Sequence, residues 1–150
     1  MHVYRISKNV YAKALIASGR ANRWNTEGKF VLYSASSLSL ACLETVVHSS
    51  GEILYKQDYK GIIIEVPENI ATAVIDINTL RENWKEREQQ SFTQDIGDEW
   101  YVKQETLVLQ VPSAVISREV NYLINTKHPD FSKVFIVEIG SFMFDKRIKS

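Results

Sequence analysis

The residue best placed to do chemistry is Glu44, an acid in a mostly apolar stretch of the chain. At about 100° per residue, the apolar side chains of residues 37–49 spread around nearly a whole circumference, which predicts a helix buried on most sides. Glu44 shares a narrow polar stripe of that helix with Ser37 and His48. A carboxylate there is costly unless it pairs or opens into a pocket. Periodicity alone favours neither a functional acid nor a structural Glu44–His48 pair.

A second set of candidate polar residues lies before and within a predicted strand at residues 30–34. Arg23 stands beside Trp24 in a segment rich in turn-forming residues. A guanidinium binds a phosphate through two hydrogen bonds, so this arginine suits an anionic ligand. On the motif alone, a surface arginine beside a core tryptophan is the favoured interpretation of the pair. Tyr33 follows within the strand, where its simplest interpretation is a core tyrosine.

Ser113 is a third candidate, because Pro112 ends the predicted strand of residues 107–111 just before it. A hydroxyl at the end of a central strand is a common site residue. No Gly-x-Ser-x-Gly motif surrounds it, so a hydrolase nucleophile is a poor interpretation. Asn121 and the polar residues that follow it are expected to shape turns.

The sequence contains no recognisable motif for a metal site or for a phosphate-binding loop. The three histidines form no metal-ligand motif, and Glu44 with His48 supplies only two candidate ligands. Neither Gly-x-Gly-x-x-Gly nor a Walker A sequence is present. We therefore expect no metal site, and we expect any nucleotide to bind outside those two phosphate-binding designs.

Composition limits the class of protein. The chain has 150 residues, with 18 basic and 18 acidic side chains and no net charge. This length fits one domain over residues 1–150, and the lack of basic excess argues against direct nucleic-acid binding. The single cysteine, Cys42, allows no internal disulfide, and no apolar run approaches the roughly 20 residues of a membrane helix. We expect a cytoplasmic protein with no membrane partner.

Both strands and helices must position these side chains. Runs rich in β-branched and aromatic residues predict strands at residues 2–6, 30–34, 61–66, 107–111 and 134–139, with a weaker one at 73–77. Apolar periodicity predicts helices at residues 37–49, 80–90, 95–103 and 118–123. Their order mixes the two types without strict alternation. It predicts an α+β, or mixed α/β, fold in a single compact domain.

Taken together, these residues resemble the RES domain, the toxin component of bacterial Xre-RES toxin-antitoxin pairs. The resemblance spans almost the whole chain, and the order and spacing of its motifs make it specific. The matching motifs are Tyr4-Arg5-Ile6, Arg23-Trp24-Asn25 with Gly28, Val31-Leu32-Tyr33, Leu40-Ala41-Cys42-Leu43-Glu44 with His48, Gly97-Asp98-Glu99-Trp100, Leu109-Gln110-Val111-Pro112-Ser113, Asn121-Tyr122-Leu123-Ile124-Asn125 and His128-Pro129-Asp130-Phe131.

The resemblance assigns the Arg, Glu and Ser for which the family is named to Arg23, Glu44 and Ser113. Tyr33 matches the usual fourth polar member. Relatives often carry glycine just before the arginine, where this chain has Asn22. Asparagine tolerates left-handed backbone better than most residues, so the loop is expected to survive the change.

The resemblance implies a fold similar to ADP-ribosyltransferase toxins and an enzyme that destroys NAD by cleaving its nicotinamide-ribose bond. NAD is then a substrate and no cofactor is implied. The acceptor is water or phosphate, as in a glycohydrolase or a phosphorylase. Glu44 would stabilise the oxocarbenium-like state or hold a ribose hydroxyl. Arg23 would hold the pyrophosphate or brace that carboxylate, Tyr33 would position the nicotinamide or the ribose, Ser113 would orient the substrate or the arginine, and Arg5 is a second candidate for phosphate contact.

Two other functions fit the same resemblance. One is a protein mono-ADP-ribosyltransferase on the same scaffold. The other is a non-catalytic RES-fold binding domain, although such a copy would be expected to have lost at least one of the four polar residues. The implied partner is an Xre-type helix-turn-helix antitoxin that blocks the pocket and supplies DNA binding. The family also suggests a homo-oligomer.

Overall fold

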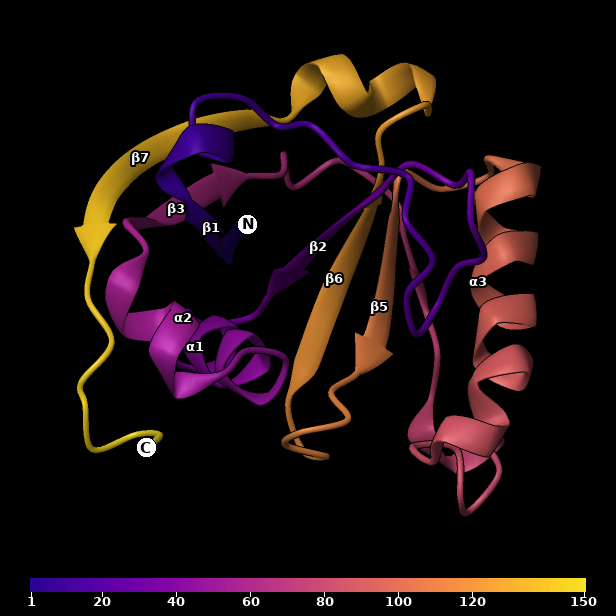
Figure 1. The fold of residues 1–150 in the computed structure, drawn as a ribbon. Coiled ribbons are helices and arrows are strands. Elements are labelled where there is room, and N and C mark those ends of the chain that lie inside the picture. The colour runs from indigo at the N-terminus through magenta and orange to yellow at the C-terminus, as the bar shows by residue number, and fades with distance from the viewer.

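One seven-stranded mixed sheet organises the computed structural model, which describes residues 1–150 (Figure 1). The strand order is β4-β5-β6-β2-β1-β3-β7, in which only β4 and β5 pair in parallel. The strands are β1 (His2–Lys8), β2 (Val31–Ala35), β3 (Tyr59–Glu65), β4 (Thr72–Val74), β5 (Val108–Pro112), β6 (Val120–Asn125) and β7 (Phe135–Phe142). The helices are α1 (Leu38–Val47), α2 (Gly51–Lys56) and α3 (Gln90–Lys103). The predicted α+β class is confirmed.

The strand pair with the fewest paired residues lies in the middle of the sheet, between β1 and β2. β1 pairs with β3 along its whole length, from His2 to Lys8, whereas β1 and β2 share the single register pair Tyr4↔Ala35. In Figure 1, β1, β3 and β7 lie on one side of this junction and β2, β6 and β5 on the other. Because the two strands separate beyond that pair, the sheet opens there, and side chains rather than backbone ladders fill the opening.

Clusters of buried apolar side chains hold the two halves of the sheet together. The cluster shared by both halves includes Val3, Leu32, Ile62, Ile64, Val108 and Ile124, all at most 1% exposed. A second cluster joins three tryptophans, Trp24, Trp84 and Trp100, to β5 and β6 on the side covered by α3. Burial of such side chains is the main stabilising term of the domain.

Helix α1 starts directly after β2 because Ser37 caps it. The Ser37 hydroxyl accepts a hydrogen bond from the Leu40 main-chain N–H at 3.0 Å, which satisfies a free donor of the first turn. The prediction that this helix is buried on most sides was wrong. Leu43 is 36% and Val47 is 50% exposed, because α1 packs on β1 and β2 with one face only. No helix in the structure is long and apolar enough to span a membrane.

Two predicted helices do not form. Residues 80–90 are turns and a short 3-10 helix, Arg87–Gln89, because Leu80 and Trp84 alone give this charged stretch no continuous apolar stripe. Residues 118–123 enter strand β6, which lies between β5 and β2 and bonds to both. Tertiary pairing on two sides outweighs the local helical pattern there. The short helix α2 was not predicted.

Helix α3 carries a glycine at its contact with the loop that holds Arg23. A Cβ added at Gly97 would lie 1.7 Å from the Trp24 carbonyl oxygen, far inside van der Waals contact. Two hydrogen bonds fix the same approach. Thr93 Oγ1 donates to the Arg23 carbonyl at 2.6 Å, and the Thr26 N–H donates to Asp98 at 2.9 Å.

Gly97→Ala tests whether this contact sets the position of the loop. Alanine would improve helix propensity by about 1 kcal/mol. The collision with Trp24 is expected to outweigh that gain and to lower the free energy of unfolding by about 1–3 kcal/mol. Urea denaturation measures the change. Gly140→Ala is the matched control, because a Cβ there meets nothing within 4 Å. A Gly97→Ala protein as stable as the wild type would contradict the close approach.

Candidate active site

The Glu44 carboxylate is held by residues from two other elements. Its Oε1 accepts a hydrogen bond from Ser113 Oγ at 2.7 Å and another from Asn121 Nδ2 at 2.7 Å. Ser113 follows β5, and Asn121 lies on β6. Both bonds reach the same oxygen, so Oε2 has no protein partner. The carboxylate is therefore fixed in orientation while one of its oxygens stays free for a ligand.

Ser113 is fixed behind the carboxylate. It is fully buried, and its Oγ accepts from the main-chain N–H groups of Val115 and Ile116, both at 3.0 Å. The single hydroxyl proton is therefore directed at Glu44. Ser113 lines neither of the two cavities beside Glu44. This placement suits a residue that orients the acid.

Asn121 is the residue of this site that the sequence did not single out. It was expected in a turn, but it pairs with Ala35 of β2 and Val111 of β5 in the middle of the sheet. Its amide N–H₂ faces Glu44, which leaves its buried Oδ1 without a partner. The alternation of Val120, Asn121 and Tyr122 was the available signal, since a polar residue in a central strand requires a partner.

Tyr33 links β2 to the loop before it. Its hydroxyl donates to Asn25 Oδ1 and accepts from the Trp24 N–H at 3.2 Å. Burial is the main cause that raises the pKa of Tyr33 far above its ordinary value, so the phenol stays protonated. The ring lines both cavities. Tyr33 thus lines the site as an uncharged side chain, and its hydroxyl also holds the preceding loop in place.

Arg23 is bound by the main chain opposite it. Its Nη1 donates to the Lys85 carbonyl at 3.0 Å and the Trp84 carbonyl at 3.4 Å, and its guanidinium lies 5.7 Å from the centre of the Trp84 ring. Burial lowers the pKa of Arg23, and the nearby charge of Glu44 opposes that shift. No hydrogen bond joins the two side chains. Asn22, beside it, does not adopt a left-handed backbone conformation.

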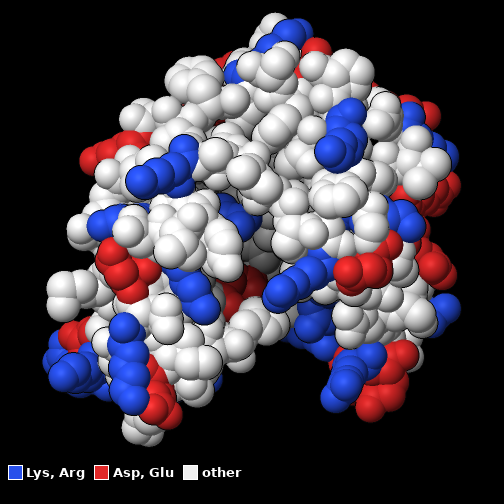
Figure 2. Space-filling view, turned by 45° about the horizontal axis from the view of Figure 1, so that its top comes forward, with Lys and Arg blue, Asp and Glu red and all other residues white.

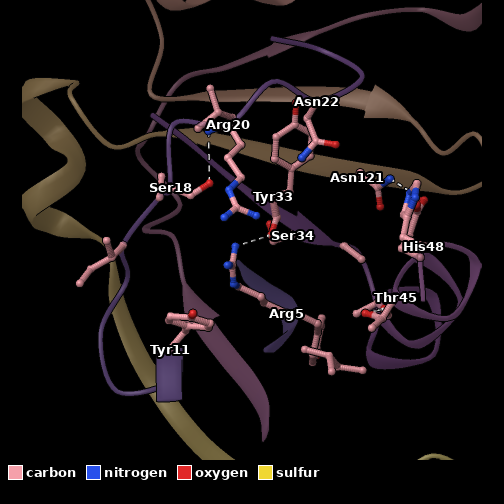
Figure 3. A pocket seen from close by; sticks show the side chains of 18 of the residues that line it. Arg5, Tyr11, Ser18, Arg20, Asn22, Tyr33, Ser34, Thr45, His48 and Asn121 are labelled. Carbon is pink, nitrogen blue, oxygen red and sulfur yellow. Dashed lines mark hydrogen bonds between the residues drawn. The ribbon is translucent and has the colours of Figure 1, made fainter. Parts of the chain in front are cut away.

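Arg5 bridges the opening between β1 and β2. Its Nη1 donates to the Tyr33 carbonyl at 3.3 Å, where the two strands have separated (Figure 3). Burial lowers the pKa of this arginine. It forms no ion pair. The guanidinium therefore replaces a missing backbone contact and keeps its charge available to the cavity.

Two cavities meet at Glu44. The larger, of about 920 Å³, lies between β1, β2, α1 and the segment that follows β1, and the smaller, of about 160 Å³, lies beside Arg23. The shared lining residues are Asn22, Tyr33, Glu44, His48 and Asn121. Figure 2 shows a hollow with Lys and Arg side chains around it and an acidic side chain within it.

The structure thus brings the five predicted site residues to one place but gives them different surroundings. Arg5 faces the larger cavity, Arg23 the smaller one, Tyr33 both, and Ser113 supports Glu44 from behind. No hydrogen bond or ion pair joins Glu44 to His48, although both line the cavities. The structural pair that helical spacing allowed does not form.

Comparison with known proteins identifies the family. The RES domain model matches residues 2–145 of the chain. The chain belongs to the RES domain family. This RES domain is 32% identical over 153 residues to "Toxin Res" of Photorhabdus laumondii, covering 99% of this chain and 97% of that protein. It is 34% identical over 139 residues to "Prs ADP-ribosylating toxin" of a Sphingobium species, covering 91% and 84%. These relationships place it among the RES-domain toxins.

A solved structure shares the fold of this RES domain. A chain of the crystal structure of the M. tuberculosis MbcT-MbcA toxin-antitoxin complex superposes with a TM-score of 0.77 at 16% sequence identity. The match covers 95% of this chain and 84% of that chain. At this identity the comparison supports the architecture of the RES domain.

Tyr33→Phe tests the structural part of this site. Removing the hydroxyl leaves Asn25 Oδ1 and the Trp24 N–H unpaired, so we expect a loss of about 1–3 kcal/mol in the free energy of unfolding. Urea denaturation measures it. Tyr122→Phe is the matched control, because the Tyr122 hydroxyl makes no hydrogen bond in the structure. Equal stability of the two variants would show that the Tyr33 hydroxyl does not hold the loop.

Proposed function

We propose that this RES domain is the toxin of a toxin-antitoxin pair and that it cleaves the nicotinamide-ribose bond of NAD. The observation that carries the proposal is the state of Glu44. One carboxylate oxygen is fixed by Ser113 and Asn121, and the other is free where two cavities meet. A carboxylate held in this way is prepared to stabilise positive charge on a bound ribose.

The chemistry needs little beyond that carboxylate. The bond between C1′ of the ribose and the nicotinamide nitrogen breaks, and its electron pair stays with the nitrogen, so the cationic ring leaves as neutral nicotinamide. The ribose becomes oxocarbenium-like, and Glu44 stabilises it or holds a ribose hydroxyl. A water oxygen then bonds to C1′ and its proton passes to solvent. NAD and water thus give ADP-ribose, nicotinamide and a proton. With inorganic phosphate as acceptor, a phosphate oxygen takes the place of water.

The two cavities place the remaining site residues against different parts of the substrate. The larger one, at about 920 Å³, is within the size range of pockets that enclose cofactor-sized ligands. Arg5, which faces it, is suited to a phosphate. Arg23 is already bound to two carbonyl groups and lies near Glu44 without bonding to it. This favours a supporting charge beside the reacting ribose over a grip on the pyrophosphate.

The names of the relatives support the proposed biological role. The curated relatives of this chain are named toxins, and the structure it resembles is a toxin-antitoxin complex. We propose that a cognate antitoxin of the Xre helix-turn-helix type blocks the cavity and binds DNA for the pair, since this chain is neutral overall.

One observation favours a third acceptor, a protein. The Sphingobium relative, at 34% identity, is named an ADP-ribosylating toxin. A protein nucleophile would then attack C1′ in place of water, and the same carboxylate would serve. NAD labelled in its adenine ring separates the two reactions, because the label ends in free ADP-ribose in one and on a protein in the other.

Glu44→Gln is the test of the proposed reaction. The amide keeps the size of the side chain but not its charge, so we expect nicotinamide release from NAD to fall at least about 100-fold with little change in melting temperature. Nicotinamide is measured by chromatography after incubating the purified protein with NAD.

The matched control is Glu105→Gln, at an exposed acid that lines neither cavity. It is expected to retain wild-type turnover. Wild-type turnover by Glu44→Gln would remove this carboxylate from the mechanism, and a wild-type protein that leaves NAD intact and transfers no label would remove the proposed reaction.

A further inference from the structure

The side chains that line the larger cavity carry more positive than negative charge, and the proposed role of Glu44 in the reaction does not account for this excess. Three cationic side chains line it, Arg5, Lys13 and Arg20, whereas Glu44 is the only acid. None of the three forms an ion pair. A cleft lined by one sign of charge raises the local concentration of ligands of the opposite sign.

Arg5 and Arg20 converge within this cavity. Figure 3 shows their two guanidinium groups pointing toward each other, Arg5 from strand β1 and Arg20 from the segment that leads to β2. Two guanidinium groups in this arrangement repel, and an anion between them turns the repulsion into attraction. Burial lowers the pKa of Arg5, which is the cost of holding that charge without a partner.

The backbone around Arg20 is fixed although its side chain is free. Its carbonyl accepts from Asn25 Nδ2 at 2.9 Å, and its N–H donates to Ser18 Oγ at 3.2 Å. Gly19, in a left-handed conformation at φ +77°, packs so closely on Phe30 that a Cβ there would lie 2.7 Å from the ring. These contacts fix the backbone from which the exposed Arg20 side chain extends along the cavity lining.

Asn25 connects this residue to the rest of the site. The side chain is 1% exposed, and it donates to the Arg20 carbonyl while accepting from the Tyr33 hydroxyl. Glu27, the acid of the same loop, accepts from the Ala21 N–H at 2.9 Å and forms no ion pair with Arg20. The guanidinium of Arg20 therefore has neither a hydrogen bond nor a counterion in the protein.

We infer that Arg20 and Arg5 form a subsite for a phosphate group, with Lys13 at its edge. Guanidinium groups bind phosphate oxygens through paired hydrogen bonds, which matches two such groups around one space. The ligand class follows from the cavity's charges alone, whereas the ligand's identity rests on the proposed function. Within that function, the phosphate comes either from the diphosphate of the dinucleotide or from free phosphate that serves as acceptor.

The first experiment measures the subsite without turnover. Sodium pyrophosphate is titrated into the full-length wild-type, Arg20→Ala and Arg118→Ala proteins by calorimetry. Arg118 is exposed, lines neither cavity and has no hydrogen bond or ion pair through its side chain, so it is the matched control. We expect Arg20→Ala to weaken pyrophosphate binding about tenfold and the control to bind like the wild type. Equal binding by Arg20→Ala, or no binding by the wild type, would overturn the inference.

The second experiment identifies the source of the phosphate. KM is measured for NAD and for nicotinamide riboside, which has the scissile bond but no phosphate, with and without inorganic phosphate. A rise in KM for NAD of about tenfold in Arg20→Ala, with nicotinamide riboside unaffected, assigns the diphosphate. Loss of stimulation by inorganic phosphate at unchanged KM for NAD assigns the acceptor. No change in either overturns the inference.

The two proposals fail separately. If the wild type does not cleave NAD but pyrophosphate binding still depends on Arg20, the proposed reaction falls and the phosphate subsite stands. If NAD is cleaved and Arg20→Ala affects neither binding nor KM, the subsite falls and the proposed reaction stands.

Discussion

The site depends on one partly buried hydrogen-bonding arrangement, the carboxylate of Glu44 between Ser113 and Asn121. A partly buried carboxylate on a mostly apolar helix must be compensated, and here two neutral donors on one oxygen provide the compensation. Neither donor is charged, so no counterion in the protein forms an ion pair with this carboxylate. The arrangement requires α1, the end of β5 and strand β6 to meet, although Glu44 and Asn121 are 77 positions apart in the chain. The central part of the sheet is therefore also the framework of the site.

The opening between β1 and β2 supplies the space in front of that carboxylate. Only one register pair joins the two strands, and Arg5 reaches across to the Tyr33 carbonyl where the ladder is missing. The loop before β2 is in turn fixed by Asn25, which binds both the Tyr33 hydroxyl and the Arg20 carbonyl. A few hydrogen bonds between side chains and backbone thus hold the Arg5 side chain and the Arg20 backbone at the cavity, and none of these bonds involves Glu44.

The sequence predicts the parts of this fold that depend on local pattern. The apolar runs that form β1, β2, β3, β5 and β7 and the cap of α1 are visible because β-branched composition and a serine before a helix are local signals. Strand β6 was missed because its conformation is set by pairing with neighbours on both sides. The same error concealed Asn121, whose role is visible only once its strand is placed beside Glu44. Arg20 was missed for a related reason, since the direction of a loop side chain depends on contacts such as those of Gly19 and Asn25.

The most direct test of the central claim is a crystal structure of the Glu44→Gln protein with intact NAD. The account predicts the dinucleotide in the cavity between β1 and β2, with a hydroxyl of its nicotinamide ribose within hydrogen-bond distance of the side chain at position 44. A dinucleotide bound elsewhere, or one whose nicotinamide ribose lies away from that side chain, would contradict it.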